Sequence, residues 1–176
     1  MGWSNGSFNF WGDCVGNREH LRGGSNATER WLDAAEALAT VRQRNRVLEV
    51  PLLVEGKRDE RALAMLGFTG PIERLNRGWP IERVVTHLFE RYGARHAIDG
   101  GPAIVLLMDW DRTGGRLQRT LREKFESLDV VVDEHLRRRL MVALKPETTV
   151  VEGMIGLVEA LRPLIDGFDQ SSSTSI

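Results

Sequence analysis

The feature of the sequence that most constrains the fold is an unbroken apolar run, AIVLLM, at residues 103–108. A strand covered on only one face alternates apolar and polar residues, whereas a strand of a parallel sheet covered on both faces is apolar throughout. The run is also far shorter than the roughly 20 apolar residues needed to span a bilayer. We therefore expect it to form a central strand of a parallel sheet.

The segments around this run repeat the order strand, turn, helix. A short apolar run predicts a strand at residues 52–54, and two further short strands are predicted at residues 72–75 and 129–132. Stretches with apolar residues at helical spacing predict helices between them, at residues 59–66, 80–92 and 114–125. This alternation is typical of βαβ units. The sequence thus predicts an α/β layered domain with a central, mostly parallel sheet of about four strands flanked by helices.

The rest of the chain is predicted to surround a core at residues 49–132. A helix at residues 27–48 precedes the core, and helices within residues 133–168 follow it and pack on it. Residues 1–26 combine glycine, serine and asparagine with scattered aromatic side chains, and we expect a flexible extension there. The polar residues 169–176 predict a disordered tail.

Composition excludes several classes of protein. Hydrophobic residues make up 41% of the 176-residue chain and charged residues 28%, which argues against disorder throughout. The net charge of −1 gives no overall basic field, so nucleic-acid binding would need a local basic face. Cys14 is the only cysteine, which excludes an internal disulfide framework. No export signal or membrane-spanning run is evident, so we expect a cytoplasmic protein without a membrane partner.

Three carboxylates follow two of the predicted strands. Glu55 comes directly after the first strand, and Asp109 and Asp111 come directly after the central one. Parallel α/β sheets bind ligands beyond the carboxyl ends of their strands, and residues i and i+2 of an extended segment point the same way. Clustered carboxylates repel unless a proton or a cation neutralises them. Magnesium, or manganese in its place, suits such a site because it accepts one or two carboxylates and leaves room for phosphate.

Glycines and basic residues beside these acids could contact phosphate. A glycine lets the backbone approach a ligand closely, and amides at a helix start can receive a phosphate oxygen. The candidates for phosphate or nucleic-acid contact are Gly56, Lys57, Arg58, Arg112, Gly114, Gly115 and Arg116. The predicted helix after Asp111 carries still more positive charge, which fits either a nucleic-acid backbone or a solvated face.

The motifs VEGKRD and MDWDRTGG resemble the Toprim domain over residues 51–132. That domain is shared by topoisomerases, bacterial-type primases, a ribosomal RNA maturation nuclease and small stand-alone archaeal proteins, and the last group looks most similar. The resemblance implies that Glu55 acts as general acid or base and that Glu55, Asp109 and Asp111 form the magnesium site. It also implies cleavage or synthesis of phosphodiester bonds in RNA or DNA, during RNA processing or DNA replication and repair, with a protein complex as a further partner.

Two residues depart from this pattern. Thr113 occupies a position where several Toprim enzymes carry a further acid, which argues against a two-metal arrangement. Tyr92 is the only tyrosine and lies within a predicted helix, so the nucleophilic tyrosine of a topoisomerase has no counterpart.

Two other functions remain open on the same residues. The string DWDRT also fits the Asp-x-Asp-x-Thr signature of haloacid-dehalogenase-type phosphatases, in which Asp109 would be a nucleophile and Asp111 an acid/base. That family expects a further acidic pair and a lysine well downstream, for which this chain leaves little room. The third possibility is a non-catalytic module that binds nucleic acid within a larger complex.

Several other residues have less specific interpretations. Residues 137–139 are three consecutive arginines that spread over different sides of a helix, and we expect them to be a solvated surface. Trp79 and Trp110 could stack on bases or pack against neighbouring loops. The four histidines lack the mutual spacing of a metal site.

Overall fold

The computed structural model describes residues 25–173, so the predicted extension lies almost entirely outside the described residues. The elements follow in the order α2 (Ser25–Leu48), β1 (Leu52–Val54), α3 (Lys57–Met65), β2 (Ile72–Arg74), α4 (Ile81–Tyr92), β3 (Ile104–Leu106), α5 (Arg112–Glu126), β4 (Val132–Asp133), α6 (His135–Leu144), the 3-10 helix η2 (Glu152–Leu157) and α7 (Val158–Ser173). None of these helices is both long enough and apolar enough to cross a membrane.

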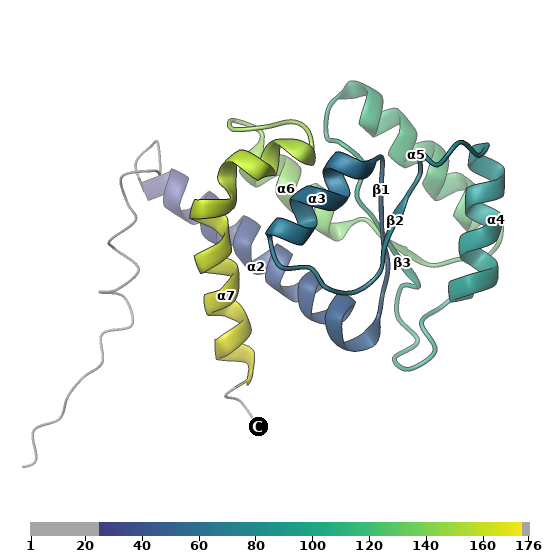
Figure 1. Ribbon diagram of the computed structural model, residues 1–176, viewed down its shortest axis with the longest axis horizontal. Coiled ribbons are helices and arrows are strands. Elements are labelled where there is room, and N and C mark those ends of the chain that lie inside the picture. Colours follow the sequence, from purple (N-terminus) through teal and green to yellow (C-terminus); the bar gives the residue numbers. More distant parts are fainter. Residues whose placement is uncertain (1–24, 174–176) are drawn as a thin grey trace, which may run out of the picture.

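The four strands form one parallel sheet in the order β2-β1-β3-β4. The strand β1 pairs with β2 on one side, with Leu52 opposite Ile72, and with β3 on the other, with Leu53 opposite Leu106. The strand β4 extends the sheet beyond β3, with Ile104 opposite Val132. The predicted α/β class, with a four-stranded parallel sheet flanked by helices, is therefore confirmed (Figure 1).

Helices cover both faces of the sheet, as the apolar strands require. Alternate residues such as Leu52 and Val105 pack against α2, α3, α6 and α7 on one face. Their neighbours Leu53 and Ile104 pack against α4 and α5 on the other. Figure 1 shows α4 and α5 on one side of the strands and the larger group of helices on the opposite side. Both faces of β1 and β3 are thus buried, which is why their sequences are continuously apolar.

The chain reverses its direction of travel across the sheet after β2. From β1 the chain crosses through α3 to β2, and from β2 it passes back through α4, beyond β1, to β3. Parallel connections are right-handed, so this reversal places α3 on the face opposite α4 and α5. The gap between the carboxyl ends of β1 and β3 is consequently the topological switch point, where open α/β sheets bind ligands.

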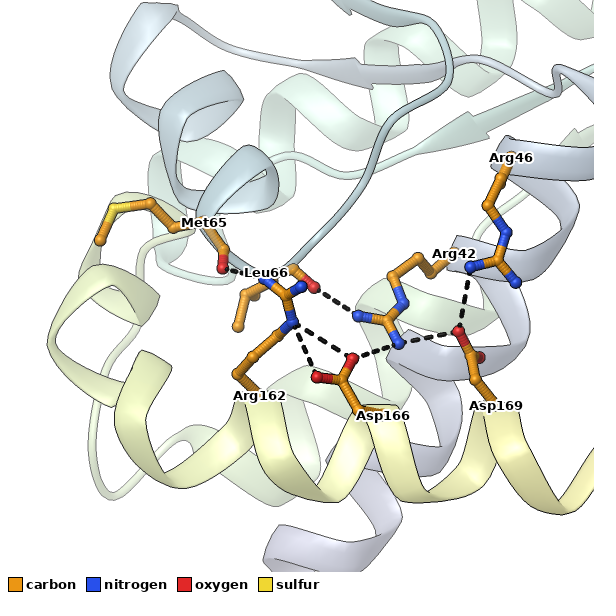
Figure 2. A network of polar contacts seen from close by, with 7 residues as sticks. All are labelled: Arg42, Arg46, Met65, Leu66, Arg162, Asp166 and Asp169. Carbon is orange, nitrogen blue, oxygen red and sulfur yellow. Dashed lines mark hydrogen bonds and ion pairs between the residues drawn. The ribbon is translucent and has the colours of Figure 1, made fainter.

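A network of arginines and aspartates joins α2, α3 and α7 (Figure 2). Arg42 of α2 donates to the main-chain oxygen of Leu66, at the end of α3, over 2.8 Å. It also pairs with Asp166 and Asp169 of α7 at 2.7 and 2.8 Å. Arg162 of α7 donates to the main-chain oxygen that precedes Leu66, at 2.9 Å. Basic side chains at the carboxyl end of a helix satisfy its last carbonyls, so this network holds the carboxyl end of α3 against α2 and α7.

The structure differs from the sequence prediction at some element ends. The last strand comprises Val132–Asp133 rather than residues 129–132, because Asp129 adopts a left-handed turn and the amide of Val131 bonds to the carbonyl of Ala94. The helices expected within residues 133–168 comprise α6, the 3-10 helix η2 and α7. The helix α7 continues to Ser173, so most of the predicted tail is helical, and residues 174–176 lie outside the described part.

Candidate functional site

Glu55 and Asp109 meet at the switch point of the sheet. Glu55 is the first residue after β1, and its main-chain oxygen accepts a 2.8 Å hydrogen bond from the amide of Asn76, just beyond β2. The main-chain amide of Asp109, beyond β3, donates to Oε1 of Glu55 at 3.3 Å. The carboxyl ends of three neighbouring strands are thus tied together by the residues that the sequence singled out.

A backbone amide from outside the sheet holds the side chain of Asp109. The Oδ1 atom of Asp109 accepts a 2.7 Å hydrogen bond from the amide of Val151. The pKa of Asp109 is raised to about 6, chiefly by burial and then by the nearby charges of Glu55, Asp59 and Asp111. The hydrogen bond from Val151 acts in the opposite direction and lowers it. Asp109 therefore lies within a concentration of negative charge.

Asp111 has two roles at the start of α5. It is the N-cap residue, and its Oδ1 atom accepts a 2.7 Å hydrogen bond from the amide of Gly114. Its side chain is exposed, yet its charge helps to raise the pKa values of both Glu55 and Asp109. The structure thus brings the three predicted carboxylates close enough to interact electrostatically.

Asp59 is a fourth acid in this cluster, which sequence reasoning missed. Its side chain is buried, and its Oδ2 atom accepts a 2.9 Å hydrogen bond from the amide of Gly56, the N-cap of α3. Burial raises the pKa of Asp59. The pKa of Glu55 is also raised, chiefly by burial and further by the negative charge of Asp59. Asp59, three residues after the N-cap, forms one half of a capping box, whereas Gly56 has no side chain to form the other half, so the usual sequence signature is incomplete.

Arg137 lies behind the acids and corrects the prediction for residues 137–139. Its Nε atom donates to the main-chain oxygen of Met108 at 3.0 Å, and its Nη2 atom donates to that of Asp109 at 2.8 Å. Only 9% of Arg137 is exposed. Arg138 is exposed as predicted, whereas Arg139 forms ion pairs with two acids of α2. The prediction of a solvated triplet is wrong for Arg137 because α6 packs that side chain against the end of β3.

Gly114 and Gly115 do not offer free amides to a phosphate in this structure. The amide of Gly114 donates to the side chain of Asp111, and that of Gly115 donates to the main-chain oxygen of Asp111 at 3.0 Å. A Cβ atom at Gly114 would lie 2.1 Å from the main-chain oxygen of Asp109. Glycine is therefore required at position 114 by the close approach of α5 to Asp109, and the predicted phosphate contact finds no support here.

The other candidates for phosphate contact surround the acids. Gly56 precedes α3 in an extended conformation that any residue can adopt, so the backbone does not require glycine here. The amide of Gly56 donates a hydrogen bond to the side chain of Asp59. The basic candidates lie in the first turn of α3 and the first two turns of α5, and all four are exposed: Lys57, Arg58, Arg112 and Arg116. Arg58 lies 3.6 Å from Glu152. Exposed positive charge thus flanks the acidic cluster from two helices.

The acids at the switch point offer oxygen ligands for one hard cation but do not by themselves form a complete ligand cage. Within residues 25–173 no group of three or more histidine, cysteine, aspartate or glutamate side chains is arranged to hold a metal. Magnesium usually takes only one or two carboxylates and keeps several waters. Asp109 and Asp111 each accept a backbone hydrogen bond at Oδ1, which leaves the Oδ2 atom of each side chain as a ligand for a cation. The chemistry of this pair fits magnesium, whereas a ready-made three-carboxylate site with Glu55 is not formed.

Trp110 packs against the loop after α6 and does not offer its ring for stacking. Its indole Nε1 donates to the main-chain oxygen of Thr148 at 2.6 Å, and its amide donates to that of Thr149 at 2.9 Å. Only 6% of the residue is exposed. The loop that contains these threonines also supplies the amide of Val151 to Asp109, so Trp110 helps to hold the site together.

Fold and site together define a three-layer α/β protein with an acidic cluster at the switch point of its parallel sheet. The chain belongs to the UPF0292 family. It is 32% identical over 144 residues to a UPF0292 protein of Thermococcus gammatolerans, which covers 80% of this chain and 95% of the relative. It is 29% identical over 123 residues to a UPF0292 protein of Methanosarcina acetivorans, covering 69% of this chain and 78% of that one.

A solved structure of a protein from Aquifex aeolicus is also similar. It is 26% identical in sequence with a TM-score of 0.50, and the match covers 66% of this chain and 94% of that one. No model of a known protein family matches the chain.

Proposed function

We propose that this protein is a magnesium-dependent enzyme of the Toprim type that acts on phosphodiester bonds of nucleic acids. The contact between Glu55 and Asp109 at the switch point carries this proposal, because burial and neighbouring acids raise the pKa of Asp109 to about 6 there. Such a cluster is unfavourable unless a proton or a cation neutralises it. A hard divalent cation with oxygen ligands is the partner that these acids favour.

Each acid has a separate role in the proposed site. Asp109 and Asp111 would hold magnesium, or manganese, which when bound would stabilise negative charge on a phosphate. Glu55 would accept or donate the proton of the reaction. Its pKa is raised by burial, which suits a group that must exchange a proton near neutral pH. The hydrogen bond from the amide of Asp109 to Oε1 keeps the Glu55 side chain facing the other acids.

Nucleic acid is the substrate class that the surrounding charge supports. Arg112, Arg116 and Arg119 are exposed on α5, and none of them pairs with an acidic side chain in the part of the chain that the structure describes. Positive side chains along a helix next to a reaction site can neutralise successive phosphates of a backbone. We propose that the enzyme works in the cytoplasm, in RNA processing or in DNA replication and repair, alongside a partner complex.

Activity on RNA, single-stranded DNA and duplex DNA, with and without magnesium, tests the proposal. We expect cleavage only with the metal, and a loss of at least about 100-fold in both Glu55→Gln and Asp109→Asn. Magnesium binding measured by calorimetry should persist in Glu55→Gln and fall in Asp109→Asn. The control is Glu126→Gln at the end of α5, which should behave as wild type. Unchanged turnover in both site variants would contradict the catalytic assignment.

Two other results would favour a function other than a magnesium-dependent phosphodiesterase. Trapping of a phosphoryl group on Asp109 would favour a haloacid-dehalogenase-type phosphatase. Magnesium-dependent binding of nucleic acid without cleavage of any of the three substrates would favour a non-catalytic module.

A further inference from the structure

The loop between β2 and α4 brings an aromatic side chain to the edge of the sheet that carries the acids. The amide of Leu75 donates to the carbonyl of Val54, and the amide of Asn76 donates to that of Glu55, both at 2.8 Å. Trp79 follows in the same loop, just before α4 begins at Ile81. Figure 1 shows this loop at the end of the sheet where α3 begins. Trp79 is thus part of a segment fastened directly to the main chain of Glu55.

Cationic and aromatic groups surround the Trp79 ring, which is partly exposed. The guanidinium carbon of Arg83 lies 4.3 Å from the ring centroid and that of Arg77 lies 5.5 Å away. The imidazole of His87 meets the indole edge-on, with centroids 5.4 Å apart. Arg77 is held by Glu73 at 2.5 Å. A stacked guanidinium that is not paired in this way keeps its N–H edge available for a phosphate.

Arg83 is the cation in this group that remains available. It is exposed, and it forms no ion pair with any side chain that the structure describes. Glu82, its neighbour in the sequence, pairs with Lys124 of α5 at 2.7 Å, which offsets the negative charge of Glu82. An incoming phosphate would therefore meet the positive charge of Arg83 beside the indole ring.

A hollow of about 460 Å³ lies over this part of α4. Its lining residues are Trp79, Glu82, Arg83, Thr86, His87 and Glu90. The volume is within the range of about 300–1,000 Å³ that small-molecule sites occupy. An aromatic surface with a guanidinium, a hydroxyl and an imidazole beside it suits a flat heterocycle attached to a phosphate. The lining also includes two carboxylates, Glu82, which pairs with Lys124, and Glu90, so the phosphate would have to lie on the Arg83 side.

We propose that Trp79 and Arg83 form a binding site for single-stranded nucleic acid, in which an unpaired base takes the place of the Arg83 guanidinium on the face of the indole and the displaced guanidinium pairs with a neighbouring phosphate. The nucleic-acid class of the ligand rests on the proposed function, whereas the preference for a single strand rests on the ring. Bases within a duplex are stacked on both faces, so only an unpaired base can present a face to a side chain. The site would hold a strand whose backbone continues toward Glu55.

Binding of short fluorescent oligonucleotides in EDTA, followed by anisotropy, tests this inference without turnover. Trp79→Ala should weaken single-strand binding about tenfold, in line with the stacking of one base, while Trp79→Phe should retain most of the affinity. Blunt duplex binding should change less than twofold in either variant. Arg83→Ala should lower the salt dependence of single-strand binding by a slope of about 0.7, as for one lost phosphate contact. Lys145→Ala, an exposed charge on another part of the surface, is the control.

Each outcome has a distinct meaning. Wild-type affinity in Trp79→Ala, equal losses in the alanine and phenylalanine variants, or parallel losses for single strands and duplexes would each overturn the inference. Urea unfolding of the same variants shows whether Trp79→Ala still folds. If it does not, the binding affinities of Trp79→Phe and Arg83→Ala test the inference instead. Metal-dependent cleavage by a protein whose binding ignores Trp79 would contradict this site alone. Single-strand binding through Trp79 without any cleavage would contradict the proposed function alone.

Discussion

The guanidinium of Arg137 donates from Nη2 to the main-chain oxygen of Asp109 at 2.8 Å, and from Nε to that of Met108 at 3.0 Å. A helix outside the predicted core thereby fixes the end of the central strand at the point where the acids gather. The amide of Val151, also from beyond the predicted core, holds the side chain of the same aspartate. The C-terminal part of the chain is therefore a structural component of the site.

Arg137→Met should destabilise the fold while keeping most of the buried volume. The buried main-chain oxygen of Met108 and the partly buried one of Asp109 would lose their donor. An unsatisfied buried group costs about 1–3 kcal/mol, so we expect a loss of about 3 kcal/mol in the free energy of unfolding. Urea unfolding measures this loss. The matched control is Arg138→Met on the same helix, where the side chain is exposed and the change should stay within about 0.5 kcal/mol. Equal unfolding midpoints for the two variants would show that the Arg137 bonds contribute nothing.

Gly114→Ala and Gly115→Ala should differ in sign, although the two residues are adjacent in α5. A Cβ atom at position 114 would lie 2.1 Å from the main-chain oxygen of Asp109, so the helix must shift, at a cost of about 1–3 kcal/mol. At position 115 the nearest atom is Nη2 of Arg137 at 3.6 Å, an ordinary contact, and alanine favours a helix by up to about 1 kcal/mol. Thermal unfolding of both variants distinguishes the two cases, and destabilisation of both alike would rule out the proposed clash.

The sequence was sufficient for the sheet and for the position of Glu55 and Asp109, because both depend on local patterns. Continuous apolar runs predict buried parallel strands, and the carboxyl ends of such strands lie together by topology alone. The predicted strand at residues 52–54 coincides with β1, and the run at 103–108 contains β3.

The partners of the acids could not be predicted in the same way. Arg137 and Val151 reach Asp109 across 28 and 42 residues of chain, and no local pattern fixes how α6 packs on the sheet. Three consecutive arginines therefore looked alike in the sequence, although only the first is buried against the site. Gly114 and Gly115 of α5 were expected to contact phosphate for a related reason. Whether a glycine there serves packing or a ligand depends on how closely the helix approaches Asp109, which the sequence does not show.

Arg42→Met should be far more destabilising than Arg162→Met, although both side chains belong to the network of Figure 2. The side chain of Arg42 is 4% exposed, and its removal takes a donor from the carbonyl of Leu66 and the shorter of two arginine contacts from the largely buried Asp169, which also lies 3.5 Å from Arg46. We expect a loss of about 2–3 kcal/mol, because an unsatisfied buried carbonyl and a weakened buried ion pair both cost free energy. Arg162 is 42% exposed, and an exposed ion pair contributes about 1 kcal/mol or less. Urea unfolding tests the difference, and a larger effect for Arg162 would contradict it.

The stability of the protein should fall as the pH rises through the titration of Asp109. The pKa of this side chain is raised from 3.8 to about 6, chiefly by burial and then by the charges of neighbouring acids. The folded chain therefore holds the proton more tightly than the unfolded chain does. This stabilisation is fully present below about pH 4 and is lost as the pH rises through about 6.

Asp109→Asn removes this titration and keeps an oxygen that can accept the hydrogen bond from Val151. Between pH 4 and pH 7 the wild type should lose on the order of 2 kcal/mol relative to the variant, since one pKa unit corresponds to about 1.4 kcal/mol and the side chain is only half-buried. Urea unfolding of both proteins across this range, in EDTA, gives the difference directly. Glu55 and Asp59 titrate in both proteins, so their contributions largely cancel. Parallel profiles for wild type and variant would mean that burial does not hold a proton on Asp109, and the reason for expecting a cation at this site would lose its main support.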